Sequence, residues 1–349
     1  MSFRDCLQLQ AAIHPSMQVQ DLIKLCYQAA FGAAHILSDA SAAKAAFREE
    51  FLSVPVGGSR LYEWISPDVC RVNFSVWKKN HLPPKWLFNL FILSASKASD
   101  GNKTFQQNLQ EVQSLIAAGA LPVSEEDWDK GLRAYEAGGV HPVHHSSCYR
   151  KEEKPAYRVV SGCFVRLFPL LQKMASIPVH EQAGVVAIDG RAASGKTTAA
   201  RRLAEITGAG VVHMDDFFLP PELRTTERFS QPGGNVHYER FLTEIVPHLR
   251  SPQPFSYRRF DCSKMDYGEL CHVKSAEWHI VEGSYSEHPS LGDYMDIRVF
   301  MNIDSKNQME RIRKRNGDKA AELFASRWIP LEETYFRACQ IQEKAEIFL

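Results

Sequence analysis

VVAIDGRAASGKTT, residues 185–198, is the stretch that decides how the second half of this chain folds. Its first four residues are all apolar, which is typical of a short strand buried on both faces. The segment from Gly190 to Thr197 then reads G-x-x-x-x-G-K-T, and a helix pattern follows from Thr197 to Ile206. The sequence therefore predicts a strand, a glycine-rich turn and a helix in direct succession.

The glycines and the lysine of this stretch predict a site for a nucleoside triphosphate. Gly190 and Gly195 allow backbone conformations that turn successive N–H groups inward at a helix N-terminus, where an anion is stabilised. Lys196 would then reach the β- and γ-phosphates, and the Thr197 hydroxyl would bind Mg²⁺. The alternative is a glycine-rich turn without a ligand. The predicted nucleotide-binding residues are Gly190, Arg191, Ala192, Ala193, Ser194, Gly195, Lys196, Thr197 and Thr198.

The periodicity of the apolar residues divides the chain into two parts. Up to about residue 177 it is mostly helical, whereas afterwards short β-branched runs alternate with helices, which predicts a parallel sheet covered by helices on both faces. We therefore expect a mostly α-helical domain at 1–177 and an α/β domain at 183–349. The expected strands are 185–189, 211–214, 279–281 and 297–303, with 345–349 as a further candidate that would place the C-terminus in the core of the fold. In the first part we expect an extended piece at 69–76 and helices at 21–31, 41–51, 84–95, 104–117, 124–137 and 161–175, with Asp21 and Ser124 as N-caps.

Three carboxylates directly follow predicted strands of the α/β domain. Asp215 and Asp216 come after 211–214, and Glu282 comes after 279–281. Open α/β sheets bind ligands at the carboxyl ends of their strands, so these acids are expected at the ligand. Either aspartate could orient a substrate hydroxyl as a catalytic base, and Glu282 could hold Mg²⁺ together with Thr197. The alternative is that these acids only cap the turns that follow the strands.

A run of basic residues, RIRKR at 311–315, closes the helix pattern that follows the strand at 297–303. Arg311 and Arg315 share one helix face, so they could act together on the nucleotide phosphates as part of a closing lid and stabilise the transferred charge. The alternative is a cationic helix C-terminus that ends at Asn316-Gly317 and is stabilised by the helix dipole.

Together these motifs resemble the uridine kinase-like branch of the P-loop kinases over about residues 183–349. The most specific segment, MDDFFLP at 214–220, looks like the D-D-F-F-x-P of nicotinamide riboside kinases and the D-S-F-Y of uridine kinases. The resemblance implies that Asp215 contacts the acceptor hydroxyl and that Asp216 lies at the substrate. The pair Tyr238-Glu239 is similar to a Tyr-Asp or Phe-Asp pair whose carboxylate grips ribose hydroxyls, although the acid here is Glu.

Three arginines of the same region are candidates for an anionic group of the substrate. They are Arg224, Arg228 and Arg240, and the alternative is that they are ordinary surface charges.

The first 177 residues match no kinase domain, and two of their features suggest binding sites. His141, His144 and His145 could bind a metal if Glu49 or Glu50 joined them, although such histidines more often bond to backbone carbonyls. A basic patch formed by Arg150, Lys151, Lys154 and Arg158 could instead bind a phosphorylated effector. The role of this domain stays open.

The composition limits the partners that the chain can have. Lys and Arg number 41 and Asp and Glu number 41, so there is no global positive field to hold nucleic acid or an anionic membrane. The eight cysteines contain no C-x-x-C pair, which is typical of reduced thiols in a cytoplasmic protein. The start of the chain lacks the apolar run of a signal peptide, and we find no stretch apolar enough to span a membrane.

These observations predict an ATP- and Mg²⁺-dependent kinase that transfers the γ-phosphate to a hydroxyl of a small molecule. The expected catalytic residues are Lys196, Asp215, Arg311 and Arg315, and the expected substrate contacts are Asp216, Tyr238, Glu239 and Arg240. A nucleoside-like acceptor such as uridine is implied by the resemblance. A sugar or vitamin precursor as acceptor, and a nucleotide-gated regulatory module, are the alternatives; the donor base and the oligomeric state stay open.

Overall fold

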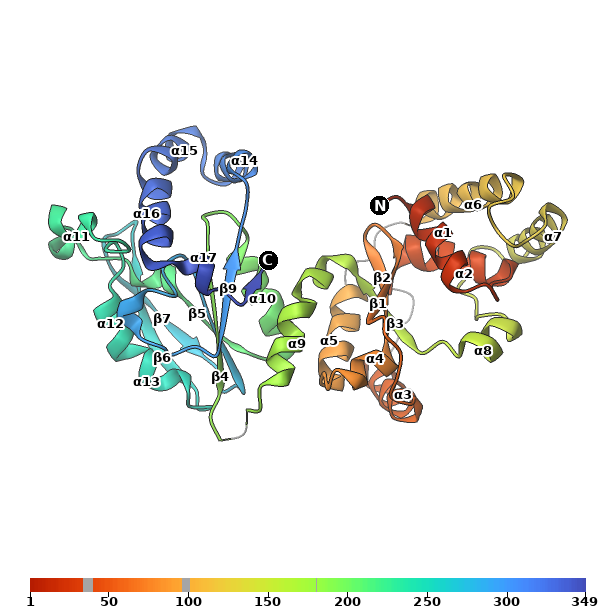
Figure 1. The fold of residues 1–349 in the computed structure, drawn as a ribbon, viewed down its shortest axis with the longest axis horizontal. Coiled ribbons are helices and arrows are strands. Elements are labelled where there is room, and N and C mark those ends of the chain that lie inside the picture. Colours follow the sequence, from red (N-terminus) through yellow and green to blue (C-terminus); the bar gives the residue numbers. More distant parts are fainter. Residues whose placement is uncertain (34–39, 96–100, 180) are drawn as a thin grey trace. The chain divides into compact units, whose positions relative to one another are not determined.

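The computed structural model describes residues 1–33, 40–95, 101–179 and 181–349, which form two compact units, Met1–Arg166 and Leu167–Leu349 (Figure 1). The division falls before helix α9 (Phe168–Ser176), whereas the sequence pattern placed it near residue 177. α9 belongs to the second unit, where the Lys173 ammonium forms an ion pair of 2.7 Å with the Glu346 carboxylate near the end of the chain.

The first unit is mostly helical, as predicted, and also contains a three-stranded antiparallel sheet in the order β1-β2-β3. The strands are β1 (Tyr62–Ser66), β2 (Val69–Asn73) and β3 (Tyr157–Ser161). The helices are α1 (Phe3–Ile13), α2 (Val19–Phe31), α3 (Ala40–Ser53), α4 (Phe74–Lys79), α5 (Pro84–Ala95), α6 (Asn102–Ala117), α7 (Glu125–Glu136) and α8 (Ser147–Glu153). None of the helices in the described part of the chain has the length and apolarity needed to cross a lipid bilayer.

Most of the predicted helices of this unit are present. Those expected at 21–31, 41–51, 84–95, 104–117 and 124–137 correspond to α2, α3, α5, α6 and α7. The helix expected at 161–175 is wrong in its first half, because Ser161 ends β3 and a 3-10 helix, Gly162–Leu167, precedes α9. The extended piece at 69–76 is β2 in its first part and the start of α4 in its last.

The two predicted N-caps of the first unit differ in outcome. Ser124 caps α7, since its side chain accepts a hydrogen bond from the backbone N–H of Asp127. Asp21 is not the N-cap of α2, because the helix begins at Val19; its carboxylate instead accepts from the backbone N–H of Gln18 at 3.0 Å. The other carboxylate contacts of Asp21 come from residues far away in sequence, which a local pattern does not reveal.

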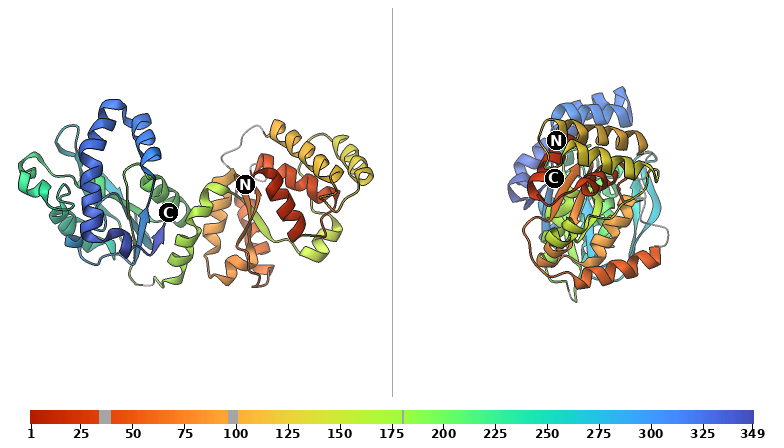
Figure 2. Two further views of the ribbon diagram at one scale, coloured as in Figure 1. Left: turned by 45° about the horizontal axis from the view of Figure 1, so that its top comes forward. Right: turned by 90° about the vertical axis from the view of Figure 1, so that its right-hand side faces the viewer.

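The second unit is built on a five-stranded parallel sheet in the order β10-β9-β4-β8-β5. Helices drawn in green and blue surround this sheet in the left view of Figure 2. All four predicted strands are present, as β4 (Gly184–Gly190), β5 (Gly210–His213), β8 (Trp278–Glu282) and β9 (Ile297–Met301). The chain runs from the central β4 to one edge at β5 and later crosses to the other side at β9. The carboxyl end of β4 is therefore the topological switch point, where open α/β sheets bind their ligands.

The last strand, β10 (Ile347–Phe348), pairs with β9 at the edge of the sheet. The side chain of Phe348 is exposed. The prediction of a strand at the end of the chain is therefore confirmed, but its position in the core is wrong.

Helices and an antiparallel hairpin surround this sheet. The hairpin, β6 (Phe255–Asp261) with β7 (Asp266–Val273), lies outside the parallel sheet and was not predicted. The α-helices are α10 (Lys196–Thr207), α11 (Thr226–Ser230), α12 (Tyr238–Glu244), α13 (Val246–Leu249), α14 (Ser305–Asn316), α15 (Asp318–Leu323), α16 (Ile329–Cys339) and α17 (Ile341–Lys344). Short 3-10 helices at Met214–Phe217, Pro221–Leu223 and Pro289–Leu291 and a π-helix at Phe324–Trp328 complete the unit.

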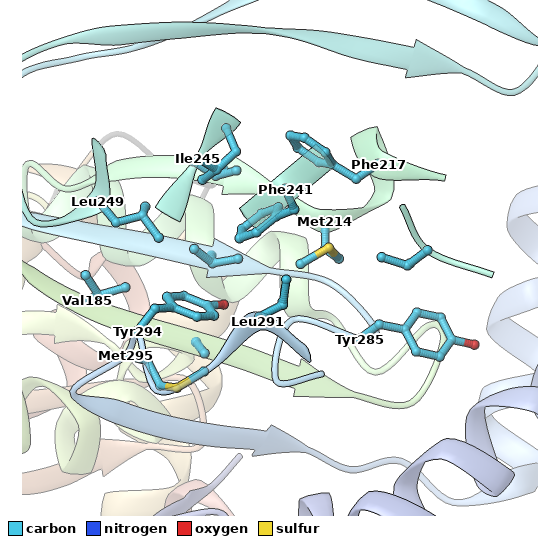
Figure 3. Packing of buried hydrophobic residues seen from close by; sticks show 14 of the residues in the cluster. Val185, Met214, Phe217, Phe241, Ile245, Leu249, Tyr285, Leu291, Tyr294 and Met295 are labelled. Carbon is cyan, nitrogen blue, oxygen red and sulfur yellow. The ribbon is translucent and has the colours of Figure 1, made fainter. Parts of the chain in front are cut away.

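The core of the second unit lies between the sheet and the segments that follow β5 (Figure 3). Every residue of β4 is buried, as its unbroken apolar run predicts. The rings of Phe217 and Phe241 lie 5.0 Å apart in a T-shaped pair, and Tyr257 of β6 packs 5.3 Å from Phe217. This packing fixes the chain directly after β5, which carries Asp215 and Asp216.

Two buried acids, Asp189 and Glu287, lie side by side at the carboxyl end of β4. The Asp189 carboxylate accepts hydrogen bonds from the backbone N–H groups of Gly190, Tyr285 and Glu287, which favours its ionised form. Burial and the neighbouring Asp189 charge raise the pKa of Glu287 to about 9. Glu287 therefore holds its proton at neutral pH.

We predict that Glu287→Gln flattens the dependence of stability on pH. The folded-state pKa of about 9 lies above the ordinary value of 4.5, so between these values the folded protein binds a proton that the unfolded chain lacks. The free energy of unfolding then falls as the pH rises through this window. The Gln side chain of the variant does not titrate, so this fall in stability should be absent. Thermal unfolding between pH 5 and 9 measures the effect. Glu269→Gln, at an exposed position of β7, is the control, and an unchanged slope in Glu287→Gln would contradict the assignment.

Candidate active site

The loop between β4 and α10 has the backbone conformation that its glycines predict. Gly190 has φ 136° and Gly195 has φ 103°, both in the region that favours glycine, and Ala193 has φ 59°. A Cβ atom on Gly190 would lie 2.2 Å from the carbonyl oxygen of Met301 in β9, so only glycine fits there. The loop therefore lies tightly over the end of the sheet and enters α10 at Lys196.

The ammonium of Lys196 lies across this loop. It donates hydrogen bonds to the carbonyl oxygens of Gly190 at 2.6 Å and Arg191 at 3.0 Å, and it lies 3.2 Å from the hydroxyl of Ser284. The Ser194 hydroxyl is buried and has no hydrogen-bond partner in the described part of the chain. The loop thus combines a concentrated positive charge, free hydrogen-bonding capacity and the N-terminus of α10, which suits an anionic ligand.

A cavity of about 680 Å³ opens over the loop. This volume lies within the range of small-molecule sites. Its lining contains ten of the predicted site residues, which are Ala192, Ala193, Gly195, Lys196, Thr197, Thr198, Asp215, Glu282, Arg311 and Arg315. The structure thus brings together residues from the loop, the ends of β5 and β8, and α14.

Glu282 and Thr197 meet at one side of this cavity. The Thr197 hydroxyl lies 3.2 Å from Oε2 of Glu282, so the two side chains present oxygen ligands of the kind that Mg²⁺ prefers. Oε1 of Glu282 lies 2.5 Å from Nδ1 of His213, the last residue of β5. This hydrogen bond raises the pKa of His213, although burial opposes the rise. His213 therefore orients Glu282, a role that no sequence motif indicated.

The two adjacent aspartates point to different places. Asp215 lines the cavity, and its side chain is accessible from it. Removal of solvent by the surrounding protein raises the pKa of Asp215 to about 6, with Lys196 acting in the opposite direction. Asp216 instead accepts a hydrogen bond of 2.7 Å from the hydroxyl of Tyr257 in β6 and is absent from the cavity lining. Only the first carboxylate faces the ligand space.

Arg311 and Arg315 of α14 both reach the cavity. Arg311 donates to the carbonyl oxygen of Ala193 at 3.1 Å and is thereby held against the loop. The guanidinium of Arg315 donates to the side chain of Asn316 at 2.7 Å. The helix pattern at 311–315 therefore places two cations beside the loop, one turn apart.

The expected substrate contacts Tyr238, Glu239 and Arg240 lie outside the cavity lining. Arg228 bonds both oxygens of the Glu239 carboxylate at 2.6 and 2.9 Å, and it lies 3.9 Å above the Tyr238 ring. Arg240 is buried and bonds the Glu244 carboxylate at 2.8 and 2.9 Å. In this structure these side chains hold segments of the chain together, and Arg224 is the arginine of this region that reaches the cavity.

Glu332 of α16 lines the cavity and was not predicted. Its Oε2 accepts a hydrogen bond from the backbone N–H of Ala192 at 3.0 Å, and its Oε1 accepts from Ser284 at 2.6 Å. It therefore ties the loop and the end of β8 to α16. Its partners are distant in sequence, so no local pattern could have indicated this role.

The outer part of the lining is rich in aromatic side chains that sequence reasoning did not assign. They are Phe218, Phe229, Tyr285, Phe324 and Trp328. Arg191, by contrast, turns away from the cavity and bonds Asn302 at 2.8 Å and the carboxylate of Glu333.

Solved structures are similar to this chain over about half of its length, and three of them are described here. A protein assigned as a possible uridine kinase, from Bacillus stearothermophilus, is 18% identical with a TM-score of 0.42, over 54% of this chain and 98% of that one. A protein assigned as a fructose transport system kinase, from Silicibacter sp., is 21% identical with a TM-score of 0.41, over 50% and 92%. The D-glycerate 3-kinase of Cryptococcus neoformans is 17% identical with a TM-score of 0.35, over 48% and 85%. No family model and no curated protein matches the sequence.

The second unit has a P-loop α/β fold. At these identities the assignment rests on features of this chain, namely the central β4, the glycine-rich loop at the switch point, and α10 directly after it. The loop can hold an anion, Thr197 and Glu282 can hold a divalent cation, and Asp215 can accept a proton from a ligand in the same cavity.

We predict that Gly190→Ala destabilises the protein by about 3 kcal/mol or more, because the added Cβ meets the backbone of β9, which cannot move aside. Gly208→Ala is the matched control: Gly208 also has a positive φ, at 85°, but a Cβ there meets nothing within 4 Å. Only the conformational cost of about 1–2 kcal/mol should appear in the control. Denaturant unfolding measures both variants, and equal losses would show that the contact with Met301 is not limiting.

Proposed function

We propose that this protein is an ATP- and Mg²⁺-dependent kinase that phosphorylates a hydroxyl group of a small molecule. The observation that carries the proposal is the position of Asp215, whose carboxylate lines the same cavity as the phosphate-binding loop. A nucleotide-binding switch needs the loop, but it does not need a carboxylate with a raised pKa facing the phosphates. A phosphoryl transfer to a hydroxyl needs both.

The donor side of the cavity has groups that fit a nucleoside triphosphate with its metal. Lys196, Arg311 and Arg315 supply positive charge for the phosphates, and Thr197 and Glu282 are the residues that would hold Mg²⁺. Bound MgATP would supply the phosphoryl group to be transferred. Because His213 hydrogen-bonds Glu282, that carboxylate is fixed in position before any ligand arrives.

The acceptor side is organised around Asp215. With a pKa of about 6, its carboxyl is mainly ionised at neutral pH and is still basic enough to take a proton from a bound hydroxyl. Its role is to orient that hydroxyl and to accept its proton during transfer. Arg311 and Arg315 would neutralise charge on the transferred group, which is the main contribution that a protein makes to this chemistry.

We further propose a nucleoside-like acceptor. The aromatic side chains Phe218, Phe229, Tyr285 and Trp328 in the lining can pack against a planar base, and the resemblance to uridine kinases in the segment 214–220 points to the same class. The carboxylate of Glu239, the expected ribose contact, is bound by Arg228. Asn235 and Arg224, which also line the cavity, are polar groups that could contact sugar hydroxyls instead.

We predict that Asp215→Asn lowers kcat by about 10²- to 10⁴-fold, because an amide cannot accept the hydroxyl proton. The affinity for ATP should stay within a few-fold. The measurement is ATP-dependent phosphorylation of uridine and a panel of other nucleosides, sugars and vitamin precursors, scored by the mass shift of the acceptor.

Asp216→Asn is the matched control for this variant. The amide oxygen can still accept the hydrogen bond of Tyr257, so its kcat should stay within about tenfold of the parent protein. The kinase proposal would be contradicted if the protein hydrolysed ATP without phosphorylating any acceptor and if Asp215→Asn left the rate of hydrolysis unchanged. That result would favour a nucleotide-gated module.

We predict an acidic limb in the pH profile of kcat/KM for the acceptor, with an apparent pKa near 6. Below this value Asp215 is protonated and cannot act as a base; above it the carboxylate is available, so activity rises with pH. Near-ultraviolet circular dichroism across pH 5–8 controls for loss of folding, since the buried Asp189 also has a raised pKa. A limb near pH 4, where an ordinary aspartate titrates, would contradict the role of Asp215.

A further inference from the structure

The first unit contains a second cavity, of about 570 Å³, that the proposed kinase activity does not use. It is lined by residues of α2, the segment before α8, α8 itself and β3. Four cationic side chains face it, and they are Lys24, Arg150, Lys154 and Arg158. Three of them belong to the basic patch at 150–158 in the sequence, and Lys24 joins them from α2 only in the folded chain.

The charges of this lining are unbalanced. Among the described residues that line the cavity, Glu50 is the one acidic side chain, and its carboxylate lies 2.7 Å from the guanidinium of Arg158. The ammonium of Lys24 donates to a neutral backbone carbonyl, that of Val143, at 2.6 Å. Within the described residues, Arg150 and Lys154 form no ion pair with a carboxylate. Three cations of this concave site therefore have no ion-pair partner among the described residues.

His145 and Tyr157 line the cavity and are called its floor here; both are hydrogen-bonded to other protein groups. Nδ1 of His145 lies 2.8 Å from the buried carboxylate of Asp21, and Nε2 lies 2.6 Å from the hydroxyl of Tyr157. The His145 ring stacks on Tyr149 at 4.2 Å, and burial lowers the pKa of His145 to about 4, so the imidazole is neutral. In the neutral ring, Nδ1–H donates a hydrogen bond to the Asp21 carboxylate, and Nε2 accepts a hydrogen bond from the hydroxyl of Tyr157.

These contacts also argue against the hypothesis that His141, His144 and His145 bind a metal ion. Both ring nitrogens of His145 are used by protein groups, and His141 turns instead to the carbonyl oxygen of Gly139 at 2.7 Å. Across the described ranges, no group of three or more His, Cys, Asp or Glu side chains is arranged to hold a metal ion. The cavity therefore offers cations, not metal ligands.

A further cation lies behind the floor. Arg71 is buried and donates to the side-chain oxygens of two neutral residues, Gln28 at 2.8 and 3.0 Å and Gln10 at 3.2 Å. Arg71 and the buried carboxylate of Asp21 act with opposite charges on His145 and Tyr157. Burial and the nearby Arg71 lower the pKa of Lys24 to about 8. An anion in the cavity would relieve this repulsion.

We propose that this cavity binds a phosphorylated small molecule, whose phosphate group is held by Lys24, Arg150 and Lys154. A phosphate dianion offers several oxygens to several donors at once, which matches three unpaired cations better than a single carboxylate does. A cavity of this volume is larger than a phosphate ion needs and leaves room for the organic part of the ligand. Its concave shape and the zero net charge of the chain do not suit an extended polyanion.

Calorimetric titration of the full chain with inorganic phosphate tests this proposal. Arg150→Gln and Lys154→Asn should each weaken phosphate binding by about tenfold or more, since each removes a charged hydrogen-bond donor. Asn is chosen at 154 because Lys154 has φ 45°, which Asn tolerates. The P-loop is unchanged in both variants, so any difference belongs to this cavity.

Lys151→Gln is the matched control. Lys151 lies next to Arg150 on α8 but is 84% exposed and does not line the cavity, so its loss should change the affinity by no more than about twofold. In a second titration, phosphomonoesters of sugars, polyols and nucleosides are added to the protein with bound phosphate. They should displace the phosphate whose binding depends on Arg150. Three results would overturn the proposal. Phosphate binding could be weakened equally in all three variants, or it could be weakened in neither cavity variant. The third result is that no phosphomonoester displaces the bound phosphate.

Discussion

The carboxylate of Asp189 holds the candidate active site together. It accepts hydrogen bonds from the backbone N–H groups of Gly190, Tyr285 and Glu287 and from the hydroxyl of Tyr335 at 2.8 Å. One buried group thereby joins the start of the glycine-rich loop, the segment after β8, and α16. Burial raises the pKa of Asp189 to about 6, yet the four donors around it favour the ionised form at neutral pH. Of the two buried acids, Glu287 is the one that holds a proton at neutral pH, because its carboxyl group accepts fewer hydrogen bonds than that of Asp189.

The same junction explains why the loop is ready for a ligand. Glu332 of α16 bonds the loop at Ala192, and Tyr335 of the same helix bonds Asp189, so one helix fixes both ends of the strand-to-loop connection. Preorganised dipoles and charges of this kind contribute to catalysis because they need not rearrange during the reaction. The cost is a concentration of carboxylates, Asp215, Glu282 and Glu332, around the single ammonium of Lys196.

The parts of this fold that sequence predicts are those set by local rules. The loop at 190–197, the strands that precede it and follow it, and most helices of the first unit depend on spacing within about ten residues. Asp215 and Glu282 follow from the rule that ligands meet the carboxyl ends of parallel strands. The β6–β7 hairpin was missed although its strands are joined by a short turn at 262–265. In the antiparallel sheet the extended piece at 69–76 was predicted, whereas β3 pairs with β2 from far away in sequence, which a local pattern does not reveal. Asp216 could not be distinguished from Asp215, since its direction depends on Tyr257, 41 positions away.

The two cavities differ in the charge that they offer, although the chain as a whole is neutral. In the candidate active site, Arg224 and the cations of the loop and α14 face Asp215, Glu282 and Glu332, so the charges nearly cancel. A divalent cation that arrives with a polyanion would offset these carboxylates, while the cations of the lining face the polyanion itself. In the cavity of the first unit the cations face one acid that is already paired, so an anion needs no metal ion there. Sequence composition averages these two environments to zero, and only the folded chain separates them.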